Sequence, residues 1–118
     1  MSTTLSRSLV VRQKSSDCCP EVHAPSLSVE RTTTLAERLK AVADPTRLQM
    51  LDLLVQQPEP LCVCDITSQF AQHQPTISHH LRVLREAGLI ETEKRGIWAY
   101  YWATDMGRSS LSAIAALD

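Results

Sequence analysis

Apolar side chains recur at the three- and four-residue spacing of amphipathic helices over residues 33–88. The pattern predicts four helices, at about 33–43, 45–57, 64–72 and 75–87. Thr33 or Thr34 is expected to cap the first helix, Asp44 to cap the second, and Gly88 to end the fourth. The side chains expected to face a common core are Leu35, Leu39, Val42, Leu48, Leu51, Leu54, Val55, Ile66, Phe70, Ala71, Ile77, Leu81 and Leu84.

The hydrophobic period changes after Gly88. A β-branched and aromatic run at 97–102 follows the segment 89–93, and Trp98, Tyr100 and Trp102 would share one face of a strand. These residues predict a β-hairpin with a basic tip, followed by a last helix at about 105–117 whose apolar positions are Met106, Leu111, Ile114 and Leu117. The element order is that of a winged helix-turn-helix, a mainly α (α+β) fold of about five helices with one β-hairpin wing.

The first 32 residues have no sustained apolar period and are rich in Ser and Thr. We expect residues 1–32 to form a flexible arm that carries Cys18 and Cys19, and residues 33–118 to form the DNA-binding and dimerisation domain. No apolar run approaches the ~20 residues of a membrane span, and Leu9–Val11 is too short for a secretory signal. We therefore expect a cytoplasmic protein without a membrane partner.

The second helix of the predicted helix-turn-helix carries a polar outer face suited to the major groove. Hydroxyl groups can meet phosphates or base edges, Gln can pair with adenine, and Arg can reach phosphates. Adjacent histidines point in different directions, so His79 is assigned to DNA rather than to a metal and His80 is left without a role. The candidate contacts with double-stranded operator DNA are Gln74, Thr76, Ser78, His79, Arg82 and Arg85, with Lys94 and Arg95 at the wing tip.

The formal net charge is −1, which gives no global argument for nucleic-acid binding. Residues 74–95 hold four Arg or Lys and three Glu, so one protomer can neutralise few phosphates. We therefore expect a dimer on a two-fold symmetric operator, with binding that weakens steeply as salt rises.

Three segments carry a family resemblance. Residues 61–66 read Leu-Cys-Val-Cys-Asp-Ile, residues 74–81 read Gln-Pro-Thr-Ile-Ser-His-His-Leu, and residues 44–48 read Asp-Pro-Thr-Arg-Leu. Over roughly residues 33–117 the chain resembles the ArsR/SmtB family of metal-sensing repressors. The resemblance implies a homodimeric winged helix with an interface built from the first and last helices. It also implies that the metal-free form holds an operator and that ligand binding releases it.

The resemblance also bears on the sensor site. The family's zinc site on the last helix uses Asp and His, and this chain has Asp105 but no His after His80, so that site is expected to be missing. A second family site uses the Cys-Val-Cys motif of the third helix, sometimes with cysteines from the partner's N-terminal arm. The adjacent pair Cys18-Cys19 is more similar to the arm of some arsenite sensors than to the wider spacing of cadmium/lead sensors.

Four thiols without a nearby His define a soft site, because thiolates prefer thiophilic ions. We favour As(III) or Sb(III), with Cd(II), Pb(II) and Zn(II) as alternatives and no organic cofactor. The start of a helix is expected to favour the thiolate form. The candidate ligands are Cys18, Cys19, Cys62 and Cys64.

Two other classes of function are weighed against a metalloid sensor. A thiol-redox repressor would use the same four cysteines, with oxidation rather than metal as the signal. We expect no enzymatic activity, because the chain has no Gly-rich phosphate loop, no carboxylate pair in a pocket-like context and no Ser/His/Asp spacing.

Overall fold

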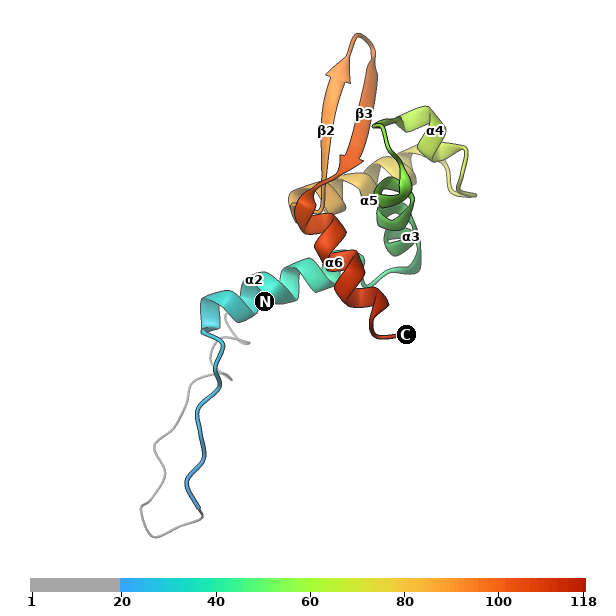
Figure 1. Ribbon diagram of the computed structural model, residues 1–118. Helices are drawn as coiled ribbons and strands as arrows, with labels where there is room; N and C mark the ends of the chain where they lie inside the picture. Colours follow the sequence, from blue (N-terminus) through green and yellow to red (C-terminus); the bar gives the residue numbers. More distant parts are fainter. Residues whose placement is uncertain (1–19) are drawn as a thin grey trace. The chain divides into compact units, whose positions relative to one another are not determined.

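The computed structural model describes residues 20–118 (Figure 1). The chain divides into two units, residues 1–37 and 38–118. Helix α2, Val29–Val42, begins in the first unit and ends in the second. Within the described residues no helix combines the length and the apolarity needed to cross a membrane.

Helix α2 begins at Val29, four residues earlier than the apolar pattern predicts. Ser28 is its cap, because Ser28 Oγ accepts a hydrogen bond from the backbone N–H of Arg31 at 3.1 Å. The threonines expected to cap the helix lie inside it. Thr33 and Thr34 each donate a hydroxyl hydrogen bond to the carbonyl four residues earlier, at 2.9 and 3.1 Å, so neither side chain serves as a cap.

The second unit follows the predicted order of elements. Helix α3, Pro45–Gln56, starts as expected, since Asp44 Oδ2 accepts from the backbone N–H of Arg47 at 3.0 Å. The remaining elements are β1 (Leu61–Cys62), α4 (Val63–Thr67), α5 (Gln74–Glu86), β2 (Ile90–Arg95), β3 (Trp98–Ala103) and α6 (Asp105–Ala115). Five helices and a β-hairpin in the described part confirm the winged helix-turn-helix (Figure 1).

The sheet contains a strand that the sequence analysis did not predict. Its order is β1-β3-β2, and both strand pairs are antiparallel. Leu61 pairs with Tyr101 and Cys62 with Tyr100, so the two-residue strand β1 lies along the wing. The first cysteine of the Cys-Val-Cys motif therefore belongs to the sheet as well as to the helix-turn-helix.

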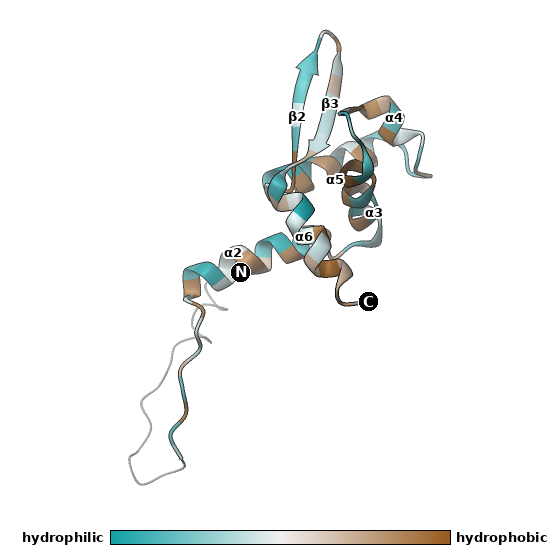
Figure 2. Cartoon of the chain, in the orientation of Figure 1, coloured by the Kyte–Doolittle hydropathy of each residue, from teal (hydrophilic) through white to brown (hydrophobic). Residues whose placement is uncertain are grey.

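The core lies where α3, α4 and α5 meet the base of the wing. Its fully buried side chains include the predicted Leu51, Leu54, Ile66, Ile77, Leu81 and Leu84, and also Met50, Leu89 and Ile90. Figure 2 shows hydrophobic segments of α3 and α5 where these two helices cross. Two side chains expected to face the core do not lie in the core of the single chain, because Leu39 is 59% exposed and Ala71 is exposed. The apolar Leu117, beyond the end of α6, is 84% exposed.

Helix α4 is much shorter than the predicted 64–72. After Thr67 the backbone changes to three-residue hydrogen bonds, from Gln69 N–H to Ile66 O and from Phe70 N–H to Thr67 O. Ser68 Oγ also donates to Asp65 O at 2.7 Å. These bonds end the α-helix, and residues 68–73 form the irregular turn that leads into α5.

Candidate DNA interface and thiol site

Helix α5 separates its core side from its outer side as the sequence predicts. Ile77, Leu81 and Leu84 are fully buried. The helix begins at Gln74, with Pro75 in its first turn, where the missing N–H of proline costs no helical hydrogen bond. All six predicted contact residues of this helix are exposed to solvent: Gln74, Thr76, Ser78, His79, Arg82 and Arg85.

The two adjacent histidines of α5 have different environments. His79 is exposed, and its Nδ1 accepts a hydrogen bond from Arg82 Nη2 at 3.1 Å. The His80 ring is half-buried, and its centroid lies 6.0 Å from that of His79, with the planes inclined at 50°.

His80 instead contacts an arginine that the sequence analysis missed. Arg47 of α3 donates from Nη1 to His80 Nδ1 at 3.1 Å and from Nε to the carbonyl of Ala41 at 2.7 Å. Because a guanidinium only donates, the neutral His80 ring carries its proton on Nε2. Arg47 therefore links the end of α2, the start of α3 and the middle of α5.

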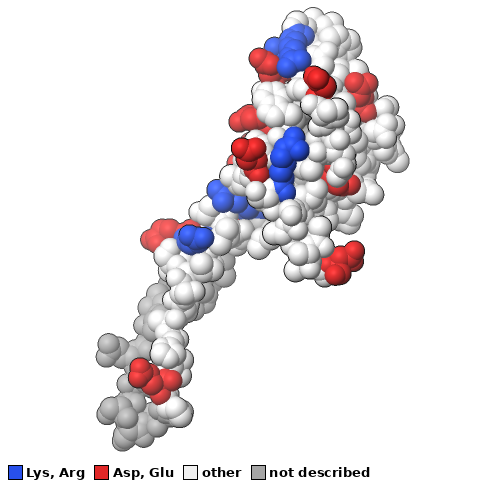
Figure 3. Space-filling model, in the orientation of Figure 1, with Lys and Arg blue, Asp and Glu red and all other residues white. Residues whose placement is uncertain are grey.

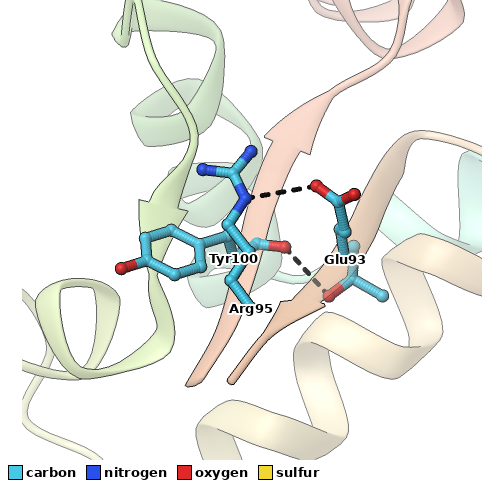
Figure 4. A network of polar contacts seen from close by, with 4 residues as sticks. Glu93, Arg95 and Tyr100 are labelled. Atoms are coloured by element: carbon cyan, nitrogen blue, oxygen red, sulfur yellow. Dashed lines mark hydrogen bonds and ion pairs between the residues drawn. The ribbon is translucent and has the colours of Figure 1, made fainter. Parts of the chain in front are cut away.

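The two predicted basic residues of the wing differ in their contacts. Arg95 Nε lies 3.2 Å from Glu93 Oε1, and its guanidinium stacks 4.8 Å from the centre of the Tyr100 ring (Figure 4). Thr92 Oγ1 donates to the Tyr100 carbonyl at 3.0 Å and closes the same network. Lys94 is exposed, and within residues 20–118 the Arg95–Glu93 pair is the one salt bridge.

Charged side chains of both signs are interspersed on the face seen in Figure 3, without a large patch of one sign. This distribution agrees with the nearly balanced charge of residues 74–95. Any DNA contact by one protomer therefore depends on a few local cations rather than on a broad positive field.

The Cys-Val-Cys motif brings two sulfurs together. Cys62 Sγ and Cys64 Sγ lie 2.8 Å apart, and both thiols are free. Cys62 is buried, at 7% exposure, whereas Cys64 is exposed. Cys18 and Cys19 lie outside the described residues. Within residues 20–118 no group of three or more potential metal-binding side chains occurs, so the described part supplies a pair of thiols.

The electrostatics of this pair differ from the sequence-based expectation. The hydrogen bond with Cys62 raises the pKa of the Cys64 thiol, with desolvation and the charges of Cys62 and Asp65 adding to the effect. Helix α4 has only five residues, and Asp65 lies in its first turn. A short helix has a weak dipole and a nearby carboxylate opposes a second negative charge, so the thiol form of Cys64 is favoured.

Cys62 occupies a junction between two elements with different roles. It pairs with Tyr100 of β3, and it is also the N-cap residue of α4. Directly opposed residues of antiparallel strands point to the same face, so the Cys62 thiol is on the face of the wing that carries Tyr100. Cys62 therefore adjoins both the wing and the first helix of the helix-turn-helix.

The chain matches the family model described as bacterial regulatory protein, arsR family, over residues 44–92, which run from the cap of α3 into β2. It is 43% identical over 77 residues to an HTH-type transcriptional regulator of Methanocaldococcus jannaschii, covering 65% of this chain and 85% of that relative. It is 48% identical over 62 residues to the arsenical resistance operon repressor of Escherichia coli strain K12, covering 52% of each protein. The chain thus spans about half of the latter relative.

Comparison with a solved structure supports the winged helix-turn-helix fold. The homodimeric winged helix-turn-helix DNA-binding domain of a possible ArsR-family regulator from Mycobacterium bovis superposes with a TM-score of 0.66. The identity is 27%, and the alignment covers 82% of this chain and 88% of that domain. The motifs, the winged fold and these similarities agree. The chain belongs to the arsR family of bacterial regulatory proteins, which are DNA-binding transcriptional regulators and not enzymes.

Proposed function

We propose that this regulator is a metalloid-responsive repressor. In this proposal the metal-free homodimer holds operator DNA, and As(III) or Sb(III) bound by cysteine thiols releases it and derepresses resistance genes. The observation that carries the proposal is the 2.8 Å separation of Cys62 Sγ and Cys64 Sγ at the start of the first helix of the helix-turn-helix. The similarity to an arsenical resistance operon repressor supports the choice of metalloid.

The donor set fits a thiophilic ligand. Cys62 and Cys64 supply two sulfurs, and a trivalent metalloid takes three, so the third comes from Cys18 or Cys19 in the proposed arm of residues 1–32. Soft sulfur donors without nitrogen or carboxylate partners favour thiophilic ions over Mg(II) or Ca(II). Cd(II), Pb(II) and Zn(II) are the alternatives within the same site, and a tetrahedral divalent ion such as Cd(II) or Zn(II) would use all four thiols.

The chemistry of the two ligand classes differs in its proton balance. Arsenous acid, As(OH)3, exchanges its three hydroxyl groups for three thiols and releases three molecules of water, so no net proton is lost. A divalent cation must displace protons from the thiols it binds, and its affinity rises with pH. The protonated thiol favoured at Cys64 is therefore better matched to arsenous acid near neutral pH than to a divalent cation.

The position of Cys62 supports a route from ligand to DNA. Thiols that close around one atom would pull on β1, which is paired with the wing at Tyr100, and on α4, whose first residue follows Cys62. In the ligand-bound protein the wing and the helix-turn-helix then have a different arrangement from the arrangement that fits the operator. A ligand shifts this equilibrium by its difference in affinity for the two arrangements, typically about 1–3 kcal/mol of coupling.

The exposed side of α5 and the wing tip are the proposed DNA contacts, namely Gln74, Thr76, Ser78, His79, Arg82, Arg85, Lys94 and Arg95. A second protomer doubles the few cations that each one presents, and the homodimeric Mycobacterium bovis domain supports this assembly. The domain proposed at 33–118 supplies both DNA binding and dimerisation. A repressor acts on the chromosome, and the proposal therefore places the protein in the cytoplasm.

The test first selects a DNA duplex that the metal-free protein binds. Fluorescence anisotropy then measures the release of this duplex when a candidate ligand is added. Arsenite and antimonite are compared with Cd(II), Pb(II) and Zn(II) under reducing conditions. Cys62→Ser and Cys64→Ser should bind the duplex with unchanged affinity and lose release by arsenite. Normal release of the duplex from Cys62→Ser would show that the ligand binds elsewhere. Release by divalent ions alone would show that the inducer is a divalent ion and not As(III) or Sb(III).

A mixed dimer tells whether the arm crosses to its partner. One chain carries Cys62→Ser, and the other carries Cys18→Ser and Cys19→Ser. If an arm completes the site of the partner protomer, the mixed dimer has one intact site and takes up one arsenite. If each arm serves its own protomer, the mixed dimer has none.

A second candidate function, thiol-redox regulation, is favoured by the same short distance between the two sulfurs. In this reading hydrogen peroxide oxidises the Cys62 and Cys64 thiols to a disulfide and is itself reduced to two molecules of water. Peroxide would then release the duplex, arsenite under reducing conditions would not, and a thiol reductant would restore binding. The opposite pattern supports the metalloid sensor.

A further inference from the structure

His80 lies on a side of α5 that the proposed DNA contacts do not use. Its ring is half-buried, whereas that of the neighbouring His79 is exposed. Helices α3 and α5 pack against each other, and the bond from Arg47 Nη1 to His80 Nδ1, at 3.1 Å, is the one hydrogen bond between their side chains within residues 20–118. Because a hydrogen bond weakens steeply with angle, this bond restricts rotation of α5 about its own axis, which apolar contacts restrict less.

The Arg47 side of this contact is held in place by two further bonds. Its Nε donates to the carbonyl of Ala41 at 2.7 Å, and its backbone N–H donates to Asp44 Oδ2 at 3.0 Å. A guanidinium that moved to follow His80 would break the bond at the end of α2. The position of Arg47 is therefore set by α2 and α3, and α5 is aligned to it through His80.

The contact between Arg47 and His80 requires a neutral histidine. A guanidinium only donates, so His80 Nδ1 must keep its lone pair. A proton on Nδ1 would remove the acceptor and place a second cation 3.1 Å from Arg47 Nη1, at a half-buried position where water screens charges less than at the surface. Imidazoles gain a proton between about pH 8 and pH 5, so a modest change in pH is sufficient to break this contact.

The other charged groups around His80 do not restore the contact. The hydrogen bond from the Arg47 N–H lowers the pKa of the Asp44 carboxyl, and the charges of Arg47 and His80 lower it further, so this carboxylate attracts a protonated ring. The attraction offsets part of the repulsion but supplies no acceptor for Arg47. The ring of His79, 6.0 Å from that of His80, adds a second positive charge when it is protonated. Helix α4 and strand β2 also pack against α5, and neither provides a hydrogen bond or a salt bridge to His80 in the described part of the chain.

We propose that Arg47 and neutral His80 are positioning residues for DNA recognition, and that protonation of His80 weakens operator binding. The inference rests on the DNA-binding function proposed above and adds to it two residues that align α5 without contacting DNA. Protonation of His79 has the opposite effect, because an exposed cation on the proposed DNA surface attracts phosphates. The two adjacent histidines therefore give opposite pH dependences.

The experiment measures affinity for a duplex selected by the metal-free protein, by fluorescence anisotropy at pH 7.5 and pH 5.5. Circular dichroism at both pH values ensures that every variant is folded. His79→Gln serves as the reference variant, because it removes the opposing titration. Its affinity should fall about fivefold at the lower pH, the loss expected for one hydrogen bond. The double variant with His79→Gln and His80→Gln keeps an acceptor that does not titrate, so its affinity should be the same at both pH values.

His80→Leu, also combined with His79→Gln, is the matched variant without an acceptor. It should bind the duplex about fivefold more weakly than the His80→Gln variant at both pH values. Arg47→Gln removes the contact from the other side. Adding His80→Leu to Arg47→Gln should cost no further affinity, because the two residues act through the same hydrogen bond.

The possible outcomes distinguish this inference from the proposed function. If the wild type selects no duplex, the proposed function fails. If the His80→Gln variant loses as much affinity at pH 5.5 as the reference variant, another group titrates, and the inference about His80 is wrong while the repressor proposal stands. Equal affinities of the His80→Leu and His80→Gln variants, or additive losses for Arg47→Gln and His80→Leu, would also overturn the inference.

Discussion

Arg47 of α3 and His80 of α5 are hydrogen-bonded at 3.1 Å although 33 residues separate them in the chain. The same guanidinium holds the Ala41 carbonyl at 2.7 Å, at the end of α2. The helix that presents the proposed DNA contacts is thus fixed from its half-buried side by a residue at the start of another helix. The exposed side of α5 is left free for DNA.

Replacement of Arg47 should therefore destabilise the fold. Arg47→Gln removes the bonds to Ala41 and His80, and we expect the free energy of unfolding to fall by about 1–3 kcal/mol, as for hydrogen bonds to partly buried groups. Urea denaturation followed by circular dichroism measures this change. Arg108→Gln is the control, since Arg108 also donates to a backbone carbonyl, that of Val55 at 3.1 Å, but is exposed. An equal loss in both variants would refute the special role of Arg47.

The cap of α3 gives a prediction with a defined pH dependence. The hydrogen bond from the Arg47 N–H lowers the pKa of the Asp44 carboxyl below 3.8. The carboxylate therefore stabilises the fold at pH values above 3.8, and this contribution is lost as the pH falls through the lower pKa of the folded state. Asp44→Ala should lower the Tm by a few degrees at pH 7 and by less at pH 3. Asp44→Asn keeps a capping side chain, and its Tm should lie closer to wild type at pH 7. Thermal melts at the two pH values check this.

Gly107 is a further position where a single added methyl group should strongly lower the free energy of unfolding. A Cβ at this residue would overlap the carbonyl oxygen of Leu89, which also accepts from the Thr104 N–H at 3.1 Å. The obstacle is backbone, so Gly107→Ala must displace α6 from the start of β2, and we expect a loss of about 2–4 kcal/mol despite the better helix propensity of alanine. Ser112→Ala, at an exposed position of the same helix, should be neutral or slightly stabilising. A stable Gly107→Ala variant would contradict the close packing of α6.

The sequence predicts those parts of the fold that have a local cause. The burial of Ile77, Leu81 and Leu84 follows from helical spacing, and the start of α3 follows from Asp44 and its neighbouring proline. Strand β1 has only two residues, too few to give any periodic signal, and its partner Tyr100 is 38 residues beyond Cys62. Its existence depends on tertiary pairing with the wing.

Some features of the candidate site could likewise be predicted from local sequence, and others depend on contacts that form only in the folded chain. The exposure of the α5 contacts was predictable because their neighbours in the helix fill the core. The contact between Arg47 and His80 was not, because no sequence pattern relates residues on different helices that meet only after folding. The thiolate expected at Cys64 was predicted incorrectly, because the prediction considered only the start of a helix and not the hydrogen bond with Cys62, which raises the pKa of the Cys64 thiol.

The pH dependence of ligand binding separates the metalloid from a divalent ion. The hydrogen bond with Cys62 keeps the pKa of Cys64 above its ordinary value, so this thiol is protonated at neutral pH. Divalent cations must displace that proton, and Cd(II)-induced release of DNA should strengthen with each step from pH 6 to pH 8. Arsenite-induced release should change little over this range, because the exchange yields water. Anisotropy titrations at pH 6, 7 and 8 measure both. A steep increase for arsenite would mean that protons leave with it and that our account of the exchange is wrong.

The salt dependence of operator binding tests the role of the exposed arginines of α5. Arg85 is exposed in the last turn of the helix, and a contact with one phosphate should contribute about 0.9 to the slope of log affinity against log salt. Arg85→Gln should lower the slope by about that amount for each protomer and weaken binding to all duplexes alike, because a phosphate contact carries no sequence information. Lys40→Gln provides the control, since Lys40 is in the last turn of α2, a helix that supplies none of the proposed DNA contacts, and the slope of this variant should match wild type. An unchanged slope for Arg85→Gln would remove this residue from the DNA interface, while loss of affinity for some sequences only would assign it to a base edge instead.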